Sequence, residues 1–232
     1  MSPQAQRFST PQALAEALAG RIAAELSRAI EARGKASLVV SGGRTPLALF
    51  EQLRQQPLPW SAVWITLADE RWVPPDSPDS NEGLVRQGLL QGPASEAHFV
   101  GLWNPAPTPE AGQAACAKAL EALPRPFEVV VLGMGDDGHT ASLFPKAPQL
   151  ATALDLEGQA LCLPIDPVTA PHPRMTLTLP ALLASRWIVL HLVGETKWQV
   201  YQQASTPGPV NELPVRAVLQ QTKVPIDVYW SP

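Results

Sequence analysis

Residues 127–145 read FEVVVLGMGDDGHTASLFP, an apolar run followed at once by three glycines, two aspartates and a histidine. A continuous apolar run without alternation is typical of a strand that is buried on both faces of a parallel sheet. Glycines allow a tight turn at its end, and ligands bind beyond the carboxyl ends of the strands in open parallel sheets. The stretch therefore predicts a parallel α/β sheet with a functional loop after the strand at 128–132.

The same alternation of strand and helix continues along the chain. The first helix can be capped by Ser9 or Thr10, has Pro11 in its first turn, repeats apolar residues every four positions and ends at Gly34. We expect further helices at 45–53, 81–90, 108–123 and 180–185 and from 194. We expect strands at 37–41, 62–67, 128–132, 186–193 and 226–230. Polar loops are expected at 69–80 and 207–214. This order predicts one α/β domain over residues 1–232, with a mostly parallel sheet covered by helices on both faces.

Composition limits the classes of function. The chain has 232 residues, a net charge of -4 and 45% hydrophobic residues, so it can bury a sizeable core. The mild acidity argues against a nucleic-acid partner. A signal-peptide pattern and an apolar run of about 20 residues are both missing, so we expect no membrane partner and a cytoplasmic location. Cys116 and Cys162 lie in apolar surroundings and are expected to be buried free thiols.

Four strand ends carry an unusual density of glycine, charged and hydroxyl residues, and they should meet at one edge of the sheet. They are SGGRTP (41–46), ADERW (68–72), GMGDDGH (133–139) and GETK (194–197). The loop 41–46 either cradles an anion with its backbone N–H groups or is simply a tight turn, and Arg44 either adds charge or faces solvent. Asp69, Glu70 and Arg71 form either a surface salt-bridge cluster or a site in which Arg71 recognises phosphate or carboxylate.

His139 is the strongest single candidate, because imidazole titrates near neutrality and commonly serves as a general base. Asp137 could orient the ring, and residues 140–144 are expected to begin a helix. Three alternatives remain: a helix cap, a simple Asp-Gly turn, or a metal site that also uses Asp136, which a single histidine makes weak. Ser142 lacks the G-x-S-x-G context of a serine nucleophile. The other histidines, at 98, 172 and 191, are less well placed.

Five blocks of the sequence resemble the 6-phosphogluconolactonases and follow the same order over almost the whole chain. They are SGGRTP (41–46), ADERWVPPDSPDSN (68–81), LGMGDDGHTASLFP (132–145), RMTLTLPAL (174–182) and GETK (194–197). The resemblance implies a Rossmann-like three-layer α/β fold and hydrolysis of 6-phospho-D-glucono-1,5-lactone, a small-molecule substrate, to 6-phosphogluconate. It also implies that no metal or other cofactor takes part. We expect a monomer.

The resemblance assigns residues one by one. His139 matches the family's proposed catalytic residue, with Asp137 nearby, and Arg71 matches a polar site position. The implied substrate or phosphate ligands are Ser41, Gly42, Gly43, Thr45, Asn81, Arg174 and Lys197. From their places after the strands we add Arg44 and Asp69 as candidate ligands and Arg71 as a candidate catalytic group that stabilises the oxyanion. Lys146 departs from the pattern, because a glycine is common at that position.

Two other functions remain open. Aminosugar-phosphate deaminases and isomerases share the fold, but they need a carboxylate in the loop after the histidine. This chain has no acid between His139 and Asp155. A sugar-phosphate-binding protein without catalysis is the second alternative, although no basic helix-turn-helix segment is evident.

Overall fold

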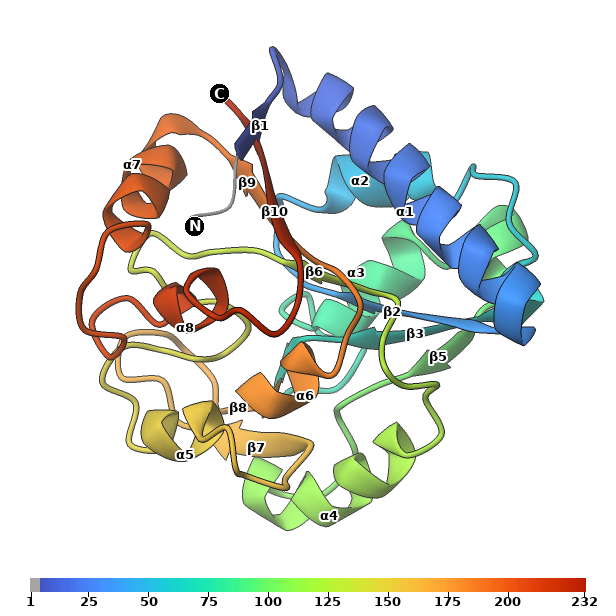
Figure 1. Ribbon diagram of the computed structural model, residues 1–232. Coiled ribbons are helices and arrows are strands. Elements are labelled where there is room, and N and C mark those ends of the chain that lie inside the picture. The colour runs from blue at the N-terminus through green and yellow to red at the C-terminus, as the bar shows by residue number, and fades with distance from the viewer. Residues whose placement is uncertain (1–4) are drawn as a thin grey trace.

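Seven parallel strands form the main sheet of the computed structural model, which describes residues 5–232 (Figure 1). Their spatial order is β1 (Ala5–Arg7), β10 (Ile226–Ser231), β9 (Ile188–Val193), β6 (Val129–Leu132), β2 (Ala36–Val40), β3 (Val63–Leu67) and β5 (His98–Val100). Every residue of β2 and β6 is buried, as expected for strands covered on both faces. The predicted parallel α/β sheet is thus confirmed, and β6 lies at its centre.

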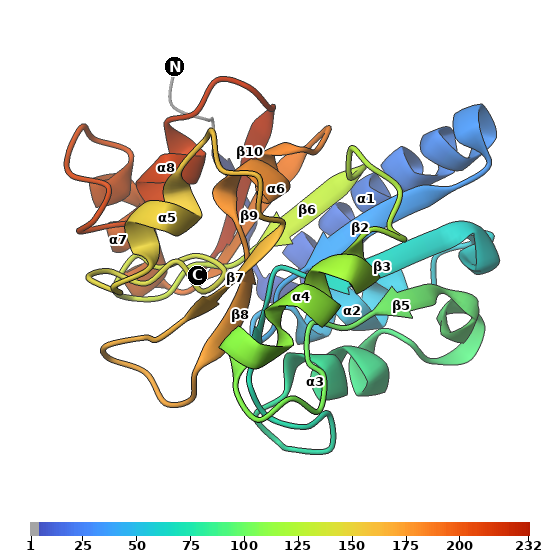
Figure 2. The same cartoon turned by 90° about the horizontal axis from the view of Figure 1, so that it is seen from below.

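Helices flank this sheet on both sides (Figures 1 and 2). The longest, α1 (Pro11–Arg33), packs on β2, β6 and β10 and beside α2 (Leu47–Leu53). Its first turn is capped by the Thr10 hydroxyl, which accepts a hydrogen bond from the N–H of Ala13, and it ends at Gly34 in the left-handed conformation. The end signals read from the sequence therefore lie where the helix begins and ends. No helix within residues 5–232 is long and apolar enough to cross a membrane.

A second, antiparallel sheet of three strands lies beside the first. Its order is β4 (Asp69–Arg71), β8 (Arg174–Leu177) and β7 (Cys162–Ile165). The helix α4 (Pro109–Leu120) packs on β7 and β8, and Cys116 and Cys162 are buried free thiols as expected. The expectation that Asp69–Arg71 begins a loop is wrong, because this polar segment pairs with β8 from Arg71–Arg174 to Asp69–Thr176.

The remaining helices connect the strands of the two sheets. They are α3 (Asn81–Gly88), α5 (Leu150–Leu154), α6 (Leu179–Leu183), α7 (Glu195–Ala204), α8 (Val215–Leu219), and the 3-10 turns η1 (Trp60–Ala62) and η2 (Gly92–Glu96). Ser80, not Asn81, caps α3, since its hydroxyl accepts from the N–H of Gly83. The helix expected from Thr140 is absent, because Ala141 adopts a φ of 48° and breaks any helical run there.

Leucine truncation offers a direct test of the packing of α1 on the main sheet. Leu18 is fully buried, so Leu18→Ala should lower the free energy of unfolding by about 2–5 kcal/mol through lost burial and the cavity left behind. Leu47 on α2 is 45% exposed, so Leu47→Ala is the matched control and should cost no more than about 0.5 kcal/mol. Urea denaturation of the three proteins measures both values. Equal losses would contradict the packing described.

Candidate active site

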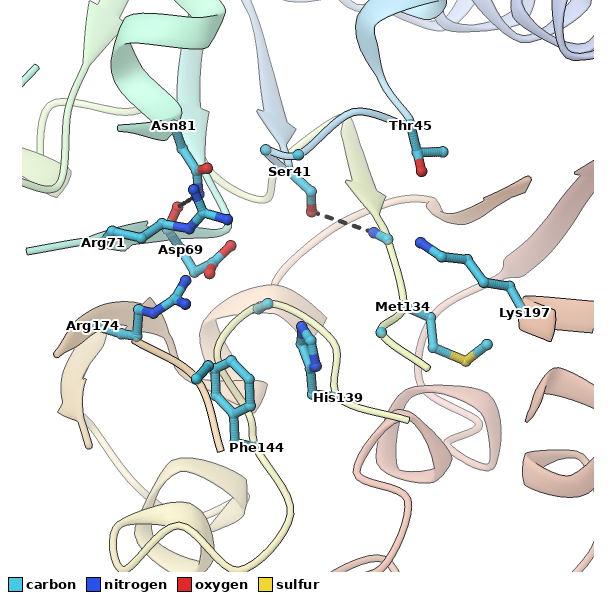
Figure 3. A pocket seen from close by; sticks show the side chains of 16 residues that line it. Ser41, Thr45, Asp69, Arg71, Asn81, Met134, His139, Phe144, Arg174 and Lys197 are labelled. Carbon is cyan, nitrogen blue, oxygen red and sulfur yellow. Dashed lines mark hydrogen bonds between the residues drawn. The ribbon is translucent and has the colours of Figure 1, made fainter. Parts of the chain in front are cut away.

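The polar loops meet in a cleft with a volume of about 250 Å³ at the carboxyl edge of the main sheet (Figure 3). The loops after β2 and β6 and the starts of α3 and α7 contribute to it, and so do β4 and β8 of the small sheet. The structure brings together ten of the twelve predicted site residues as lining groups. They are Ser41, Gly42, Gly43, Thr45, Asp69, Arg71, Asn81, His139, Arg174 and Lys197.

Two of the predicted residues do not line the cleft. Arg44 is exposed, and its positive charge lowers the pKa of Lys197. Asp137 contacts the ring of His139 instead of the cavity. Lys146 is also outside the cleft, and its φ of 62° explains why a glycine suits that position.

The side chains of His139 and Asp137 form the most definite polar pair in the site. Asp137 Oδ1 lies 2.6 Å from His139 Nδ1 and also accepts from the backbone N–H of His139 at 3.1 Å. Burial alone would raise the pKa of Asp137, but the hydrogen bonds and charge of His139 outweigh burial and lower it below the ordinary value. Asp137 is thus a carboxylate that can only accept, so Nδ1 of the ring carries a proton.

Gly135 is required by the close approach of this pair. A Cβ atom at Gly135 would lie 2.2 Å from two atoms of the His139 ring and 2.7 Å from Asp137 Oδ1. On its other side the ring stacks on Phe144, with 4.2 Å between the ring centroids. Phe144 was expected in a helix and was not singled out as a site residue. It could have been found only from the fold, because its sequence signal is that of an ordinary apolar residue.

Two arginines and an aspartate occupy one side of the cleft, and Lys197 occupies the other (Figure 3). Arg71 and Arg174 are direct partners in the β4–β8 pairing. Burial lowers the pKa of Arg174, the charge of Asp69 raises it, and the charge of Arg71 lowers it. Asp69 itself is held by the Ser142 hydroxyl, which donates to its Oδ2 at 2.5 Å. This side of the cleft therefore combines two guanidinium groups with the carboxylate of Asp69, which the Ser142 hydroxyl holds in place.

The opposite side combines one ammonium group with backbone donors. Burial lowers the pKa of Lys197, while the negative charge of Asp136 raises it. The N–H groups of Gly42 and Gly43 make no hydrogen bond to any of residues 5–232, so they are available to a ligand. Thr45 adds a hydroxyl to the same side. Such a combination suits a phosphate or carboxylate group.

Asn81 links the two halves of the site. Its Nδ2 donates to the backbone oxygen of Asp69 at 2.8 Å, which fixes the orientation of the amide. Its Oδ1 is buried and has no partner within the described chain. The amide packs so closely on Gly42 that a Cβ there would lie 1.9 Å from Oδ1.

Glu70 is a polar residue near the cleft that sequence reasoning did not single out. It is fully buried, and its carboxylate accepts hydrogen bonds from the N–H groups of Arg71, Asn81 and Glu82 and from the Ser80 hydroxyl. Burial raises the pKa of Glu70 to about 7, against the opposing effect of these four donors. The only available signal in the sequence was its place between Asp69 and Arg71.

The histidines other than His139 do not line the cleft. Within residues 5–232, no group of three or more His, Cys, Asp or Glu side chains is arranged to hold a metal ion. His98 and His172 are away from the cleft lining, and His191 is buried in β9. The cleft can therefore offer one imidazole, with its Nε2 free, to an anionic ligand that is held by guanidinium, ammonium and backbone N–H groups.

Comparison with known proteins places this geometry in context. The family model described as glucosamine-6-phosphate isomerases/6-phosphogluconolactonase matches residues 9–230. A 6-phosphogluconolactonase of Mesorhizobium japonicum is 48% identical over 219 residues, covering 94% of this chain and 91% of the relative. One from Rhizobium meliloti is 45% identical over 232 residues, covering 100% of both chains. The crystal structure of a 6-phosphogluconolactonase from Shewanella baltica is 56% identical, covers 98% of this chain and 97% of that one, and has a TM-score of 0.96.

The burial of His191 predicts a specific acid sensitivity. Burial, together with the charge of Lys197, lowers the pKa of His191 from 6.5 to about 4. As the pH falls below 6.5, His191 becomes protonated in the unfolded chain but stays neutral in the folded chain until about pH 4. The free energy of unfolding therefore falls over this range. The loss attributable to this group reaches about 3 kcal/mol.

Replacement of His191 should remove this contribution. We expect His191→Gln to lose less stability than the wild type as the pH falls from 6.5 to 4. His98→Gln, at an exposed position, is the matched control and should keep the wild-type dependence. Urea denaturation at several pH values measures how steeply the free energy of unfolding of each protein changes with pH. A His191→Gln protein with the full wild-type slope would show that His191 is not the source.

Proposed function

The chain belongs to the glucosamine-6-phosphate isomerase/6-phosphogluconolactonase family, and we propose that it hydrolyses 6-phospho-D-glucono-1,5-lactone to 6-phosphogluconate. This reaction is the second step of the oxidative pentose phosphate pathway. The observation that carries the proposal is the His139–Asp137 pair, which presents one free imidazole nitrogen to a cleft with cationic groups on two sides. The sequence identity to 6-phosphogluconolactonases over the whole chain supports the choice of substrate.

Asp137 determines which nitrogen of the His139 ring carries the proton. Because the carboxylate holds the proton on Nδ1, the lone pair of Nε2 is free to accept a proton from water. The carboxylate also stabilises the imidazolium that forms when this proton arrives. Stacking on Phe144 and contact with Gly135 restrict rotation of the ring. His139 is therefore built as a general base with a fixed orientation.

The reaction uses His139 twice. As water attacks the carbonyl carbon of the lactone, Nε2 takes a proton from it and a tetrahedral oxyanion forms. The bond between the carbonyl carbon and the ring oxygen then breaks, and the imidazolium returns its proton to that oxygen. The products are a carboxylic acid at C1 and a hydroxyl at C5, and the histidine is neutral again. The carboxylic acid, which keeps the second proton of the attacking water, then releases that proton to solvent and becomes the carboxylate. No metal or other cofactor is needed for any of these steps.

Two groups of donors bind the phosphate and stabilise the oxyanion. Lys197, Thr45 and the free N–H groups of Gly42 and Gly43 bind the phosphate, with Arg174 adding positive charge from the facing side. Arg71 stabilises the oxyanion as charge develops on the carbonyl oxygen. Fixing the phosphate positions the lactone carbonyl near His139, which lowers the entropic part of the barrier.

The rival deamination of an aminosugar phosphate finds less support. The segment after His139 supplies a hydroxyl from Thr140 and one from Ser142, and neither Thr140 nor Ser142 lines the cleft. Asp69, the carboxylate that lines the cleft, already accepts a hydrogen bond from Ser142, and Asp137 accepts one from His139. We also propose that residues 1–232 act as a single domain, as a cytoplasmic monomer.

Acid release from freshly prepared lactone tests the proposed function. The wild-type protein should accelerate proton release well beyond the spontaneous opening of the lactone, which a protein-free sample measures. Glucosamine 6-phosphate should release no ammonia under the same conditions. Ammonia release without lactone hydrolysis would reverse the assignment in favour of a deaminase, and binding of 6-phosphogluconate with neither reaction would indicate a non-catalytic binding protein.

Removal of the imidazole tests the mechanism separately. His139→Ala should lower the catalysed rate by about 10²–10⁴-fold, since it removes the general base and leaves the phosphate ligands in place. His98→Ala, which removes an exposed imidazole far from the lining groups, is the control and should keep the wild-type rate. A His139→Ala protein with near wild-type kcat/KM, after subtraction of spontaneous hydrolysis, would rule out this role.

A further inference from the structure

The carboxylate of Glu70 joins two segments that both reach the cleft. Glu70 is in the middle of β4, and its partners at 80–82 are the cap and first residues of α3. Between them runs the nine-residue segment 72–80, which contains three prolines and has no regular structure of its own beyond turns. The position of α3 relative to β4 therefore depends on contacts between the two ends of this segment.

Both oxygens of Glu70 are fully used in these contacts. Oε1 accepts from the N–H groups of Arg71 and Asn81, each at 2.7 Å. Oε2 accepts from the N–H of Glu82 at 2.7 Å and from the Ser80 hydroxyl at 3.0 Å. The carboxylate thus takes the place that a bound anion often occupies at the N-terminus of a helix.

The two residues whose N–H groups share Oε1 are the ones that present side chains to the cleft. Arg71 and Asn81 both line it, whereas Glu70 is fully buried and does not. The amide of Asn81 is further fixed by Asp69 and Gly42, and its Oδ1 is left buried and without a partner in the described chain. An unpartnered acceptor of this kind is costly unless a ligand supplies a donor.

We propose that Glu70 is a positioning residue for catalysis: its carboxylate holds Arg71 and Asn81 at the geometry that the substrate requires. Glu70 touches neither the substrate nor His139, and it acts only through these two neighbours. In this arrangement the amide of Asn81 packs on Gly42 and so supports the loop that binds the phosphate, and Arg71 keeps its guanidinium towards the reacting carbonyl. This role rests on the proposed lactone hydrolysis.

Glu70→Gln is the most conservative test, because glutamine keeps the shape and the Oε1 acceptor. It replaces Oε2 by an amide donor that faces the N–H of Glu82, and it removes the negative charge that strengthens the bonds from the N–H groups of Arg71 and Asn81. We expect kcat/KM for the lactone to fall by about tenfold in an otherwise wild-type protein, the effect of losing one good hydrogen bond. In a protein that already carries Arg71→Ala and Asn81→Ala, the same substitution should lower kcat/KM by less than about twofold, because the residues it acts through are gone.

Ser80→Ala controls for stability alone. It removes one donor to Glu70 and the cap of α3, but it leaves the bonds to Arg71 and Asn81 in place. Its melting temperature should fall, while kcat/KM stays within about twofold of the wild type. If Glu70→Gln does not fold, Glu70→Asp, which retracts the carboxylate by one methylene, is carried through the same comparison.

The dissociation constant for 6-phosphogluconate, measured by calorimetry in the same set of proteins, gives a second readout that needs no turnover. An inactive wild type would contradict the proposed function and would leave this binding comparison intact. Equal losses of kcat/KM or of affinity in both backgrounds, or no loss in the wild-type background, would overturn the positioning role of Glu70.

Discussion

The parallel pairing of β6 with β2 on one side and β9 on the other is the constraint on which the site depends. Parallel strands end at the same edge of a sheet, so the loops after these three strands must lie together. No single segment has a complete set of groups. The loop after β2 supplies free N–H donors, the loop after β6 supplies the imidazole, and the start of α7 after β9 supplies the ammonium group of Lys197. The small antiparallel sheet then adds two arginines from the side through β4 and β8. A change that shifted the register of β6 would move His139 relative to the groups that the segments after β2 and β9 supply.

Two carboxylates, the exposed Asp137 and the buried Glu70, fix the orientation of groups in this site. Asp137 determines which nitrogen of His139 faces the cleft, and Glu70 ties β4 to the start of α3. Each accepts backbone N–H groups as well as a side-chain donor, so each fixes the main chain and a functional group together. Glycines at 42 and 135 permit this, because a methyl group at either place would collide with the side chain being aimed. The site is therefore held by hydrogen bonds to acids that do not themselves line the cleft.

Much of this could be predicted from the sequence. Continuous apolar runs indicated the main strands, and the polar residues directly after them indicated the edge at which they meet. The failures have physical causes. The strand Asp69–Arg71 is short and polar, and it exists only because β8 pairs with it. The expected helix after His139 is prevented by the backbone of Ala141, which no composition signal reveals. The partners of Glu70 lie across the irregular segment 72–80, and Ser142 bonds Asp69, which is 73 residues away. Long-range partners of this kind follow from the fold and not from local pattern.

The most direct measurement of the central claim is a crystal structure of the protein with 6-phosphogluconate bound. The account predicts that the product lies in the cleft, with its C1 carboxylate within hydrogen-bonding distance of Nε2 of His139. Its phosphate should contact Lys197 and the N–H groups of Gly42 and Gly43. A product bound outside the cleft, or one whose phosphate rather than its C1 carboxylate faces His139, would contradict the account.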